Sequence, residues 1–408
     1  MIGLTSRKIA KSILPRSAID KLRNFAIHKE RRQYGRQGAR LKTVLETLKS
    51  LENVSGENYL KLHQDHLEEI AASPPVVGEI EINDSCNIDC LMCNTSKATR
   101  PKGLMDLITF ERVINEIAEA GNKSSVSLHT IGDPLSNKRL PKYLEILRKY
   151  NIHVGAISTN ALLLHKQMDT VFEYRDIIDQ FMVSIDGSSK HIYEKIRKGG
   201  NFEQLHENLL AFTKRNNASQ NPFPTWISSV ITTDNYSELA YMPSVFDYFT
   251  PPSHITYSLL NGVTADDAYF SASKIFDDDY YRCSPCHFLW GEVHVQKNGD
   301  LTACVRDYNG DLVFGNIEDG PLEKEFNNEK IRAMRRAHLI GDVEKLPTMC
   351  QTCFFPDNCL NVIINGTIHY YYEHVNGSSA ELQQCLNKML PLLKEKKFEE
   401  VEKLILAL

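Results

Sequence analysis

The stretch "VVGEIEINDSCNIDCLMCN", residues 76–94, joins an apolar, strand-like run to a loop that carries three cysteines. Cys86, Cys90 and Cys93 are separated by three residues and then by two. Thiolates at this density bind zinc or iron–sulfur clusters, and a structural zinc ion takes four protein ligands. Three thiolates leave one metal position open. On zinc that position normally holds water, and on a [4Fe–4S] cluster it leaves one iron available to a small molecule.

Length and composition indicate a globular protein with more than one domain. The chain has 408 residues, of which 42% are hydrophobic and 24% are charged, and this length suggests two or three domains. No apolar run is long enough to span a bilayer, and the first residues lack the apolar core and the small-residue cleavage site of a signal peptide. We therefore expect a cytoplasmic protein without a transmembrane segment.

Basic residues are concentrated at the N-terminus. Residues 1–50 contain 13 Lys and Arg against 3 Asp and Glu, although the whole chain has a net charge of −5. Such an arm could approach an acidic surface, a nucleic acid, an anionic lipid or the acidic body of the same protein. Because it lacks interleaved aromatic residues for base stacking, we expect a solvated or self-docking face and no nucleic-acid partner.

Strand and helix patterns alternate after residue 75. Six short apolar runs, "VVGEIEI", "SVSLHTI", "HVGAIST", "QFMVSID", "WISSVITT" and "HITYSLL", are separated by helix-like stretches such as "DLITFERVINEIAEAG". Repeats of this kind predict a parallel sheet, either open or curved into part of a barrel. We predict an α/β fold, a partial (β/α)6 barrel of the TIM type, in which chemistry collects at the C-terminal ends of the strands.

The same pattern divides the chain into five expected parts. Apolar residues three and four apart predict helices near the N-terminus, and Pro74 and Pro75 end that segment. Ser378 and Glu381 form a capping-box pattern, and the chain ends in the amphipathic "KFEEVEKLILAL". The expected parts are a basic helical extension (1–75), the partial barrel (76–262), an acidic linker (263–282), a cysteine-rich module (283–365) and a helical C-terminal segment (366–408).

The other seven of the ten cysteines lie beyond residue 282. Without a secretory signal, cysteines favour metal over disulfides. The "KNGD" turn in "CSPCHFLWGEVHVQKNGDLTAC" lies between alternating runs and predicts a β-hairpin, and "CQTCFFPDNC" follows further along the chain. From the residues alone, two C-x2-C pairs and a hairpin cysteine could also form a zinc ribbon. The cysteines of the two stretches are Cys283, Cys286, Cys304, Cys350, Cys353 and Cys359.

The cysteine loop of residues 86–93 resembles the signature of the radical S-adenosylmethionine (SAM) superfamily. In that family SAM binds the open iron of a [4Fe–4S] cluster, and one electron cleaves SAM to methionine and a 5′-deoxyadenosyl radical that abstracts hydrogen from the substrate. The resemblance implies that Cys86, Cys90 and Cys93 hold this cluster. It also implies an external electron donor such as flavodoxin or ferredoxin. Met92 replaces the usual aromatic residue, and its soft apolar side chain can serve as the cofactor contact there.

Three later stretches within residues 76–262 resemble the SAM-binding segments of the same family. "HTIGDPLSN" resembles the "GGEP" loop, "ISTNALLL" resembles the "STNG" strand end with Ala161 in place of glycine, and "VSIDGSSKHIYEKIRKGG" resembles the fifth strand and its helix. Without the resemblance these residues would be read as a turn, helix caps and a surface salt bridge. His129 is expected to be structural. The implied SAM contacts are Gly132, Asp133, Pro134, Ser158, Thr159, Asn160, Ser184, Asp186 and Arg197.

The C-terminal cysteines resemble the SPASM/twitch extension of one branch of this superfamily. There, a cysteine before a hairpin, the G-x4-C cysteine that ends it and a later C-x2-C pair hold an auxiliary [4Fe–4S] cluster. A two-cluster form would use Cys283, Cys359 and a distal cysteine such as Cys385, and would need a further cysteine where Ile363 stands. We expect one auxiliary cluster, with two clusters or a zinc site as alternatives, and Cys385 as a buried thiol. The implied ligands are Cys286, Cys304, Cys350 and Cys353.

The substrate is less constrained than the cofactors. Members of this branch act on ribosomally made peptides or on small polyols and sugars. Residues 1–75 lack the hairpin pattern of a leader-peptide-binding domain, and the single-cluster module resembles that of aminocyclitol dehydrogenases. We expect an oxidoreductase or epimerase acting on a sugar, an aminocyclitol or a nucleotide-linked sugar, with a peptide maturase and a non-catalytic iron–sulfur scaffold as alternatives. In "CVRDYNGD", Asp307 is the candidate base and Arg306 and Tyr308 are candidate substrate contacts, while a turn is the structural alternative.

Overall fold

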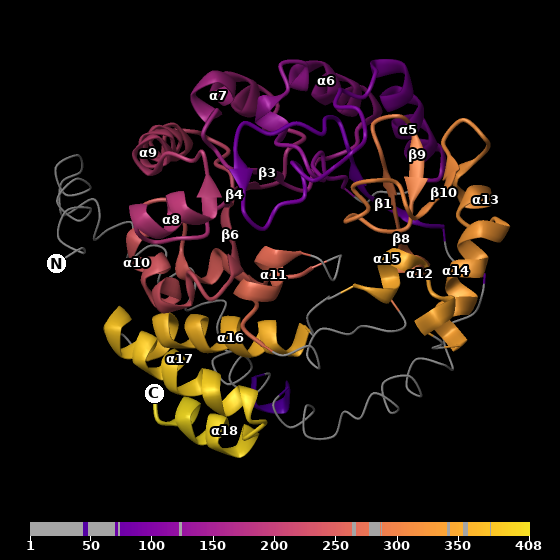
Figure 1. Cartoon of the computed structure of the whole chain (residues 1–408). Helices are drawn as coiled ribbons and strands as arrows, with labels where there is room; N and C mark the ends of the chain where they lie inside the picture. The colour runs from indigo at the N-terminus through magenta and orange to yellow at the C-terminus, as the bar shows by residue number, and fades with distance from the viewer. Residues whose placement is uncertain are drawn as a thin grey trace.

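The computed structural model describes residues 44–47, 70–71, 74–121, 125–262, 267–276, 286, 288–340, 343–353, 358–375 and 377–408. In these ranges, α/β repeats form an arc whose outer rim carries helices, and a hairpin region and the C-terminal helices continue the ring (Figure 1). The predicted N-terminal helices lie outside the described residues except for the helical turn at 44–47. No helix in the described ranges is long and apolar enough to cross a membrane.

All six predicted strand segments run parallel. Four strands form one sheet in the order β3-β4-β6-β7, with parallel pairing throughout. Isolated parallel bridges extend this arrangement, because Ser127 pairs with Glu79, and Val154 pairs with both Val126 and Ile178. The prediction of an α/β partial barrel is therefore confirmed. The barrel strands are β1 (Val76–Ile80), β3 (Ile157–Thr159), β4 (Phe181–Ser184), β6 (Thr225–Ile231) and β7 (Ile255–Leu259).

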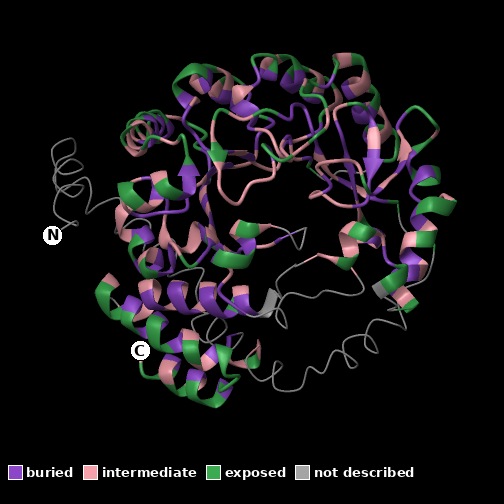
Figure 2. Cartoon of the chain, viewed as in Figure 1, coloured by how far each residue is buried: buried purple, intermediate pink, exposed green. Residues whose placement is uncertain are grey.

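Amphipathic helices cover the outer face of these strands. Helix α5 begins after Asp106, whose carboxylate accepts hydrogen bonds from the backbone N–H groups of Ile108 and Thr109, both at 2.9 Å. Such a cap contributes about 1 kcal/mol. Buried residues face inward and exposed residues outward on each helix (Figure 2). The helices of this part are α5 (Leu107–Glu119), α6 (Leu140–Tyr150), α7 (Leu164–Glu173), α8 (Lys190–Ile196), α9 (Phe202–Asn217) and α10 (Met242–Val245), with short 3-10 helices at Pro134–Ser136, Tyr236–Tyr241 and Pro252–His254.

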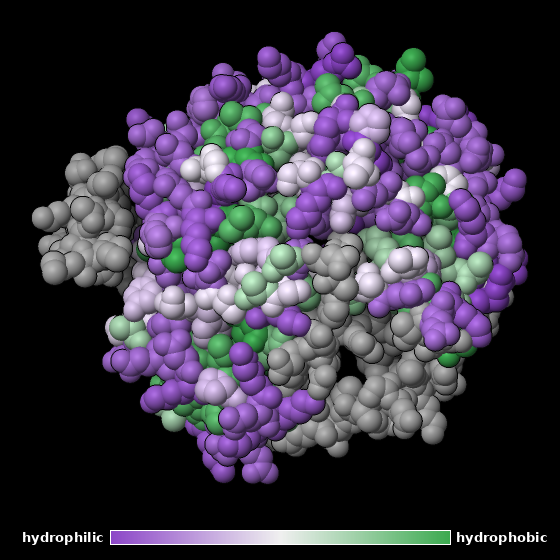
Figure 3. Space-filling model, in the orientation of Figure 1, coloured by the Kyte–Doolittle hydropathy of each residue, from purple (hydrophilic) through white to green (hydrophobic). Residues whose placement is uncertain are grey.

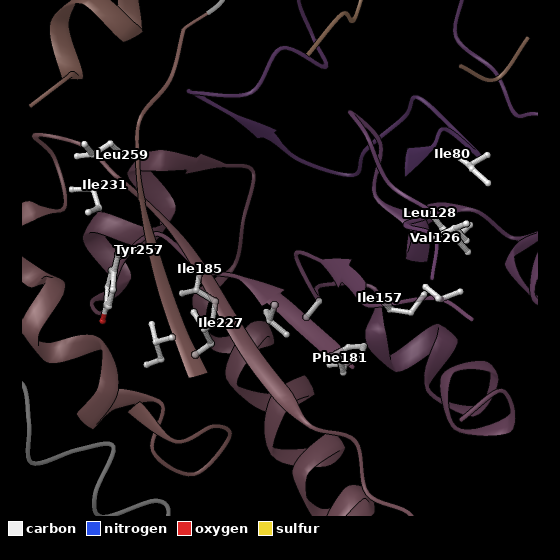
Figure 4. Packing of buried hydrophobic residues seen from close by; sticks show 14 of the residues in the cluster. Ile80, Val126, Leu128, Ile157, Phe181, Ile185, Ile227, Ile231, Tyr257 and Leu259 are labelled. Atoms are coloured by element: carbon white, nitrogen blue, oxygen red, sulfur yellow. The ribbon is translucent and has the colours of Figure 1, made fainter. Parts of the chain in front are cut away.

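The core lies between the strands and these helices. Ile80, Val126, Leu128 and Ile157 point from neighbouring strand segments into one apolar layer (Figure 4). Phe181 is fully buried in the same layer and stacks on Phe212 of α9 at a centroid distance of 4.3 Å. Each fully buried side chain of this size contributes roughly 1.5–3 kcal/mol, so this layer fixes the positions of the strand ends that carry the candidate site.

A second sheet joins the barrel to the cysteine-rich region. Strand β8 pairs parallel with β1, so that Val77 lies beside Val293, and the sheet continues in the order β1-β8-β9-β10. The predicted hairpin is confirmed, because β8 and β9 are antiparallel. Gly299 in their connection has a φ of +85°, a conformation that favours glycine. The strands are β8 (Glu292–Val295), β9 (Asp300–Thr302) and β10 (Val313–Asn316).

The segment predicted as a linker contains a helix. Asp267 caps α11 (Ala268–Ser273) by accepting a hydrogen bond from the N–H of Phe270 at 3.0 Å, and Phe270 is buried. The acidic composition of residues 263–282 concealed this short amphipathic turn. The small helices of the cysteine-rich region are α12 (Phe288–Gly291), α13 (Leu322–Glu325), α14 (Glu329–Ile340) and α15 (Thr348–Gln351), with a 3-10 turn at Val343–Lys345.

The C-terminal helices cover the open edge of the barrel sheet. Three side chains of α16 at intervals of four residues bond the backbone of the edge strand β7. Asn361 accepts from Leu259 N at 2.9 Å, Asn365 bonds both N and O of Tyr257, and His369 contacts Ile255 O at 2.8 Å. The predicted capping box of Ser378 and Glu381 is present. The elements are α16 (Asn358–Tyr370), a π-helical turn (Tyr371–Val375), α17 (Ser379–Lys394) and α18 (Phe398–Leu406).

Candidate active site

The cysteine loop begins after β1 and is held against the segment that follows α8. The short strand β2 (Asp89–Cys90) pairs antiparallel with β5 (Arg197–Lys198), so Cys90 lies opposite Arg197. At the start of the loop, the buried Asp84 accepts a hydrogen bond from Gly103 N at 2.8 Å and forms an ion pair with Lys297 at 2.7 Å. The barrel and the cysteine-rich region therefore both anchor the loop.

Each sulfur of the loop faces a hydrogen-bond donor. Asn160 Nδ2 lies 3.5 Å from Cys86 Sγ, and Arg197 Nη1 lies 3.9 Å from Cys90 Sγ. Cys93 Sγ lies 3.0 Å from the Thr95 hydroxyl and 3.5 Å from the Thr95 N–H. Donors of this kind tune the potential of a cluster held by the thiolates. The sequence did not predict Thr95, although its position two residues after Cys93 was a usable signal.

Burial disfavours free thiolates at this site. Desolvation is the main reason that the pKa of Cys86 is raised to about 11, and that of Cys90 to about 12. The charge of Arg197 lowers the pKa of both thiols, but by less than burial raises it. A metal ion or cluster would supply the positive charge that three clustered thiolates require.

Asp133 connects the loop after the second strand segment to the end of β3. Its carboxylate accepts hydrogen bonds from the Thr159 hydroxyl at 2.9 Å, from Asn160 N at 2.8 Å and from Leu135 N at 2.9 Å. Burial raises the pKa of Asp133, and these hydrogen bonds oppose that rise. Of the predicted SAM contacts, Asp133, Thr159 and Asn160 are thus brought together, with Asp133 as an internal connector that also positions the donor to Cys86.

Gly132 lies where no larger residue fits. A Cβ atom there would be 2.3 Å from the carbonyl oxygen of Asn83, well inside any real contact. Asn83 Nδ2 in turn donates to the carbonyl oxygens of Ser85 at 2.7 Å and Asp133 at 3.3 Å. The glycine therefore allows the "IGDP" loop to lie against the start of the cysteine loop. Pro134 follows, buried, as the first residue of a 3-10 turn.

Asp186 and Arg197 form a buried ion pair. Asp186 Oδ2 and Arg197 Nη2 are 2.7 Å apart, and both side chains are almost fully buried. Asp186 also accepts a hydrogen bond from Val230 N at 2.6 Å. The two predicted SAM contacts are therefore partners of each other, and Arg197 connects this pair to the Cys90 thiol.

The other predicted contacts lie at the same strand ends. Ser158 and Ser184 are half-buried positions between buried neighbours on β3 and β4, and Ser184 is in register with Ser228. Met92 is partly buried and packs against the core. His129, expected to be structural, is half-buried and its Nδ1 lies 2.7 Å from the Ser127 hydroxyl, with desolvation lowering its pKa to about 4.

An open groove of about 650 Å³ borders the cysteine loop. Its lining includes the loop residues Cys86 and Asn87 and two basic residues, Lys102 and Lys198. Lys102 Nζ donates to the carbonyl oxygens of Asp84 at 3.1 Å and Thr95 at 2.6 Å. The visible surface around the arc is largely hydrophilic (Figure 3).

The four predicted auxiliary ligands gather around the end of the hairpin. The Cys304 thiol interacts electrostatically with Cys350 and Cys353, and the Arg306 guanidinium interacts with Cys304, Cys353 and Cys286. Burial raises the pKa of Cys304 to about 11 and that of Cys350 to about 12. This is a second group of desolvated thiols, suited to a metal cluster by the same reasoning.

Of the three remaining cysteines, Cys385 is the one whose side chain the structure describes. Cys385 is a buried thiol on α17, between Leu382 and Leu386 in the core, as expected. Ile363, where a second auxiliary cluster would need a thiol, is fully buried among apolar residues. Cys283 and the side chain of Cys359 lie outside the described residues.

Asp307 organises the turn after the hairpin. Its buried carboxylate accepts hydrogen bonds from the Thr302 hydroxyl at 2.6 Å and from the backbone N–H groups of Gly310, Asp311 and Leu312 at 2.7–2.8 Å. Because four donors bond this one carboxylate, the contacts favour Asp307 as a residue that forms the turn. Its role as a base stays a prediction. The Tyr308 carbonyl oxygen accepts from Arg100 Nε at 2.7 Å.

The two groups of thiols are chemically suited to bind iron–sulfur clusters. Within the described ranges, no group of three or more His, Cys, Asp and Glu side chains is arranged to hold a single metal ion. The three thiols of the loop, with one donor to each sulfur, fit a [4Fe–4S] cluster whose fourth iron binds another molecule.

Comparison with known proteins agrees with this chemistry. Residues 80–235 match the radical SAM superfamily, and residues 286–354 match the SPASM iron–sulfur cluster-binding domain. The S-adenosyl-L-methionine-dependent 2-deoxy-scyllo-inosamine dehydrogenase of Niallia circulans is 25% identical over 297 residues, which span 72% of this chain and 96% of that enzyme. A probable GTP 3′,8-cyclase of Methanococcus maripaludis is 26% identical over 132 residues, or 32% of this chain and 43% of that protein.

A solved structure shares the fold. Streptococcus suis SuiB, bound to its precursor peptide SuiA, has a TM-score of 0.51 at 15% identity, covering 74% of this chain and 73% of SuiB. A partial barrel with three thiols after its first strand defines a radical SAM protein. Residues 80–235 form a radical SAM domain and residues 286–354 a SPASM-type iron–sulfur domain, as the sequence predicted.

Proposed function

We propose that this enzyme uses the radical derived from SAM to remove hydrogen from a hydroxyl-bearing carbon of a small polar substrate, for dehydrogenation or epimerisation. The observation that carries the proposal is the loop of Cys86, Cys90 and Cys93, with a donor to every sulfur, in a chain of the radical SAM superfamily. A small amino-bearing polyol is favoured because the dehydrogenase from Niallia circulans aligns over 96% of its length.

The residues of the chain would prepare the site in three ways. Cys86, Cys90 and Cys93 would hold the first [4Fe–4S] cluster, which with bound SAM supplies the radical. Asp133 would keep Asn160 directed at Cys86, and the Asp186–Arg197 pair would keep Arg197 directed at Cys90.

The C-terminal thiols would hold one auxiliary [4Fe–4S] cluster. The structure supports this with the electrostatic contacts among Cys304, Cys350 and Cys353 and with Arg306 beside Cys286. After anaerobic reconstitution we expect about eight irons per chain, four for each cluster. About twelve irons would favour two auxiliary clusters, and about four irons with stoichiometric zinc would make the C-terminal site structural.

Substrate class can be tested with reduced, reconstituted enzyme and SAM. We expect formation of 5′-deoxyadenosine to increase when 2-deoxy-scyllo-inosamine or a related aminocyclitol is added, with an oxidised or epimerised product detected by mass spectrometry. Formation of 5′-deoxyadenosine that responds only to peptides would overturn the small-molecule assignment. No 5′-deoxyadenosine under any condition would favour an iron–sulfur scaffold and overturn the proposed function. The donor of the electron in the cell, expected to be a flavodoxin or ferredoxin, remains part of this proposal.

A further inference from the structure

The backbone of Cys286, one of the implied auxiliary ligands, is held by helix α14. Helices α12 and α14 lie beside each other, and Cys286 comes just before α12 (Figure 1). Two buried side chains of α14 bond the backbone there: His338 Nδ1 accepts from Cys286 N at 3.4 Å, and Arg335 Nε donates to Leu289 O at 2.7 Å. Leu289 N in turn donates to Cys286 O at 3.3 Å. The helix therefore fixes both ends of the turn that begins at Cys286.

The fully buried Arg335 makes α14 a firm support for this turn. Its Nη2 donates to Phe326 O at 2.7 Å, and its Nη1 donates to Asn327 Oδ1 at 2.8 Å. Asn327 Oδ1 also accepts from Ala71 N at 3.0 Å, so the same contacts reach the residues that precede the barrel. The guanidinium lies 4.6 Å from the centre of the Phe326 ring. His338, three residues further along the same helix, is therefore held in a fixed position.

His338 has one ring nitrogen without a hydrogen-bond partner among the described residues. The residue is 3% exposed, and the unpartnered, buried nitrogen is Nε2. Because Nδ1 accepts the Cys286 N–H, it carries no proton, and the proton of the imidazole must be on Nε2. Nε2 is thus a buried donor that lacks an acceptor. Buried polar groups are normally satisfied, so this donor indicates an acceptor that the protein chain itself does not supply.

The auxiliary site would supply such an acceptor. Cys286 belongs to the group of thiols around the Arg306 guanidinium, together with Cys304 and Cys353. Both nitrogens of His338 belong to one five-membered ring, so Nε2 lies close to Cys286 as well. The sulfur atoms of a [4Fe–4S] cluster accept hydrogen bonds from neighbouring N–H groups. Ligation of iron by His338 is disfavoured, because a ligating histidine needs an unprotonated nitrogen toward the metal and donates with the other one.

We propose that His338 donates a hydrogen bond from Nε2 to a sulfur of the auxiliary cluster beside Cys286 and thereby raises the reduction potential of that cluster. The proposal rests on the proposed function, since the auxiliary cluster is part of it. A hydrogen bond to sulfur stabilises the reduced, more negative form of a cluster. His338 acts through the cluster and makes or breaks no covalent bond, so it is a positioning residue. The bond would leave the first cluster, held by the barrel, unchanged.

An anaerobic redox titration of the reconstituted full chain, followed by EPR, tests the proposal. SAM alters the signal of a cluster with an open iron, so the signal that SAM leaves unchanged is that of the auxiliary cluster. Two variants separate the nitrogens of His338. In His338→Asn an amide oxygen can replace Nδ1 as the acceptor for Cys286 N–H, but the side chain does not extend to the place of Nε2. In His338→Gln an amide N–H can reach that place.

We expect the equilibrium constant for reduction of the auxiliary cluster to fall about tenfold in His338→Asn, or about 59 mV for one electron. The shift in His338→Gln should be less than half as large. The control is His165→Asn, at an exposed position of α7, which should leave both potentials unchanged. An unchanged potential in His338→Asn would overturn the proposal. Equal falls in His338→Asn and His338→Gln, or loss of the auxiliary iron from both, would assign His338 to structural support of Cys286 and overturn its role as a donor.

Two further results separate this proposal from the proposed function. Zinc in place of the auxiliary cluster in the wild type would overturn the assignment of that cluster and the role of His338 with it. The wild type and both His338 variants are also tested for formation of 5′-deoxyadenosine. Its absence from the wild type, with the potentials shifted as expected, would overturn the proposed function and support the role of His338. Its presence with unshifted potentials would overturn the role of His338 alone.

Discussion

Arg197 and Asp186 form a buried ion pair, with Nη2 and Oδ2 2.7 Å apart, directly beside the thiol of Cys90. The pair connects β5 to the end of β4 and so fixes the loop that β5 holds. Neither charge has access to bulk water, and each therefore depends on the other.

The first prediction follows from this dependence. Asp186→Asn leaves the guanidinium buried without its counter-charge, and we expect a loss of about 3–5 kcal/mol in the free energy of unfolding. Asp169→Asn breaks an exposed pair with Arg215 and should cost less than about 1 kcal/mol. Urea unfolding measures both. Equal losses in the two variants would show that the buried pair does not support the loop.

A second prediction concerns the donors to sulfur. The Thr95 hydroxyl donates to the Ile131 carbonyl oxygen, but beside a cluster-bound thiolate at Cys93, which can only accept, the same proton can turn to Sγ, 3.0 Å away. Thr95→Val removes this hydroxyl with little change of shape and leaves the Thr95 N–H in place. Hydrogen bonds to thiolates stabilise the reduced, more negative form of a cluster, so we expect a lower reduction potential of the first cluster. An anaerobic redox titration followed by EPR measures it. Thr99→Val, which alters an exposed contact with Asn309, is the control; a shift of the same size in Thr99→Val would refute the role of Thr95.

The close approach at Gly132 gives the third prediction. In Gly132→Ala the new methyl group would be placed 2.3 Å from Asn83 O, so the "IGDP" loop must move away from the cysteine loop. We expect a destabilisation of about 1–3 kcal/mol or more and weaker SAM binding. Gly291→Ala, where a Cβ meets nothing within 4 Å, should retain both properties. Unchanged SAM affinity in Gly132→Ala would contradict the role given to this contact.

Much of the fold could be predicted from the sequence because its signals are local. Alternating apolar runs identified all six parallel strand segments, and "KNGD" identified the β8–β9 hairpin. The helix α11 was missed because one turn with Phe270 as its buried residue is too short to establish a period. The parallel pairing of β1 with β8 could not be predicted either, since it joins residues more than 200 positions apart.

The site could be predicted only where a residue type carries the chemistry by itself. The cysteines were identified by spacing, whereas the partners of polar residues depend on tertiary contacts. Asp133 bonds Thr159 and Asn160, and Asp186 bonds Arg197. Each of these residues was predicted separately to contact SAM, and in the structure they also bond one another.

A fourth prediction concerns the edge of the barrel sheet. Asn365→Ala on α16 leaves both the N–H and the carbonyl of Tyr257 without their side-chain partner, at about 1–3 kcal/mol for each group. Asn217→Ala, at an exposed position of α9, should change the free energy of unfolding by less than about 0.5 kcal/mol. Denaturant unfolding distinguishes them. If Asn365→Ala is as stable as Asn217→Ala, the helix does not hold β7 through this side chain.

The assignment of the radical SAM site is tested most directly by SAM cleavage. Wild type and a variant with Cys86, Cys90 and Cys93 all changed to Ala are reconstituted without oxygen and reduced, and 5′-deoxyadenosine is measured. We predict its formation by the wild type and none by the triple variant, which should still retain the roughly four irons of an auxiliary cluster. Continued formation of 5′-deoxyadenosine by the triple variant would contradict the assignment.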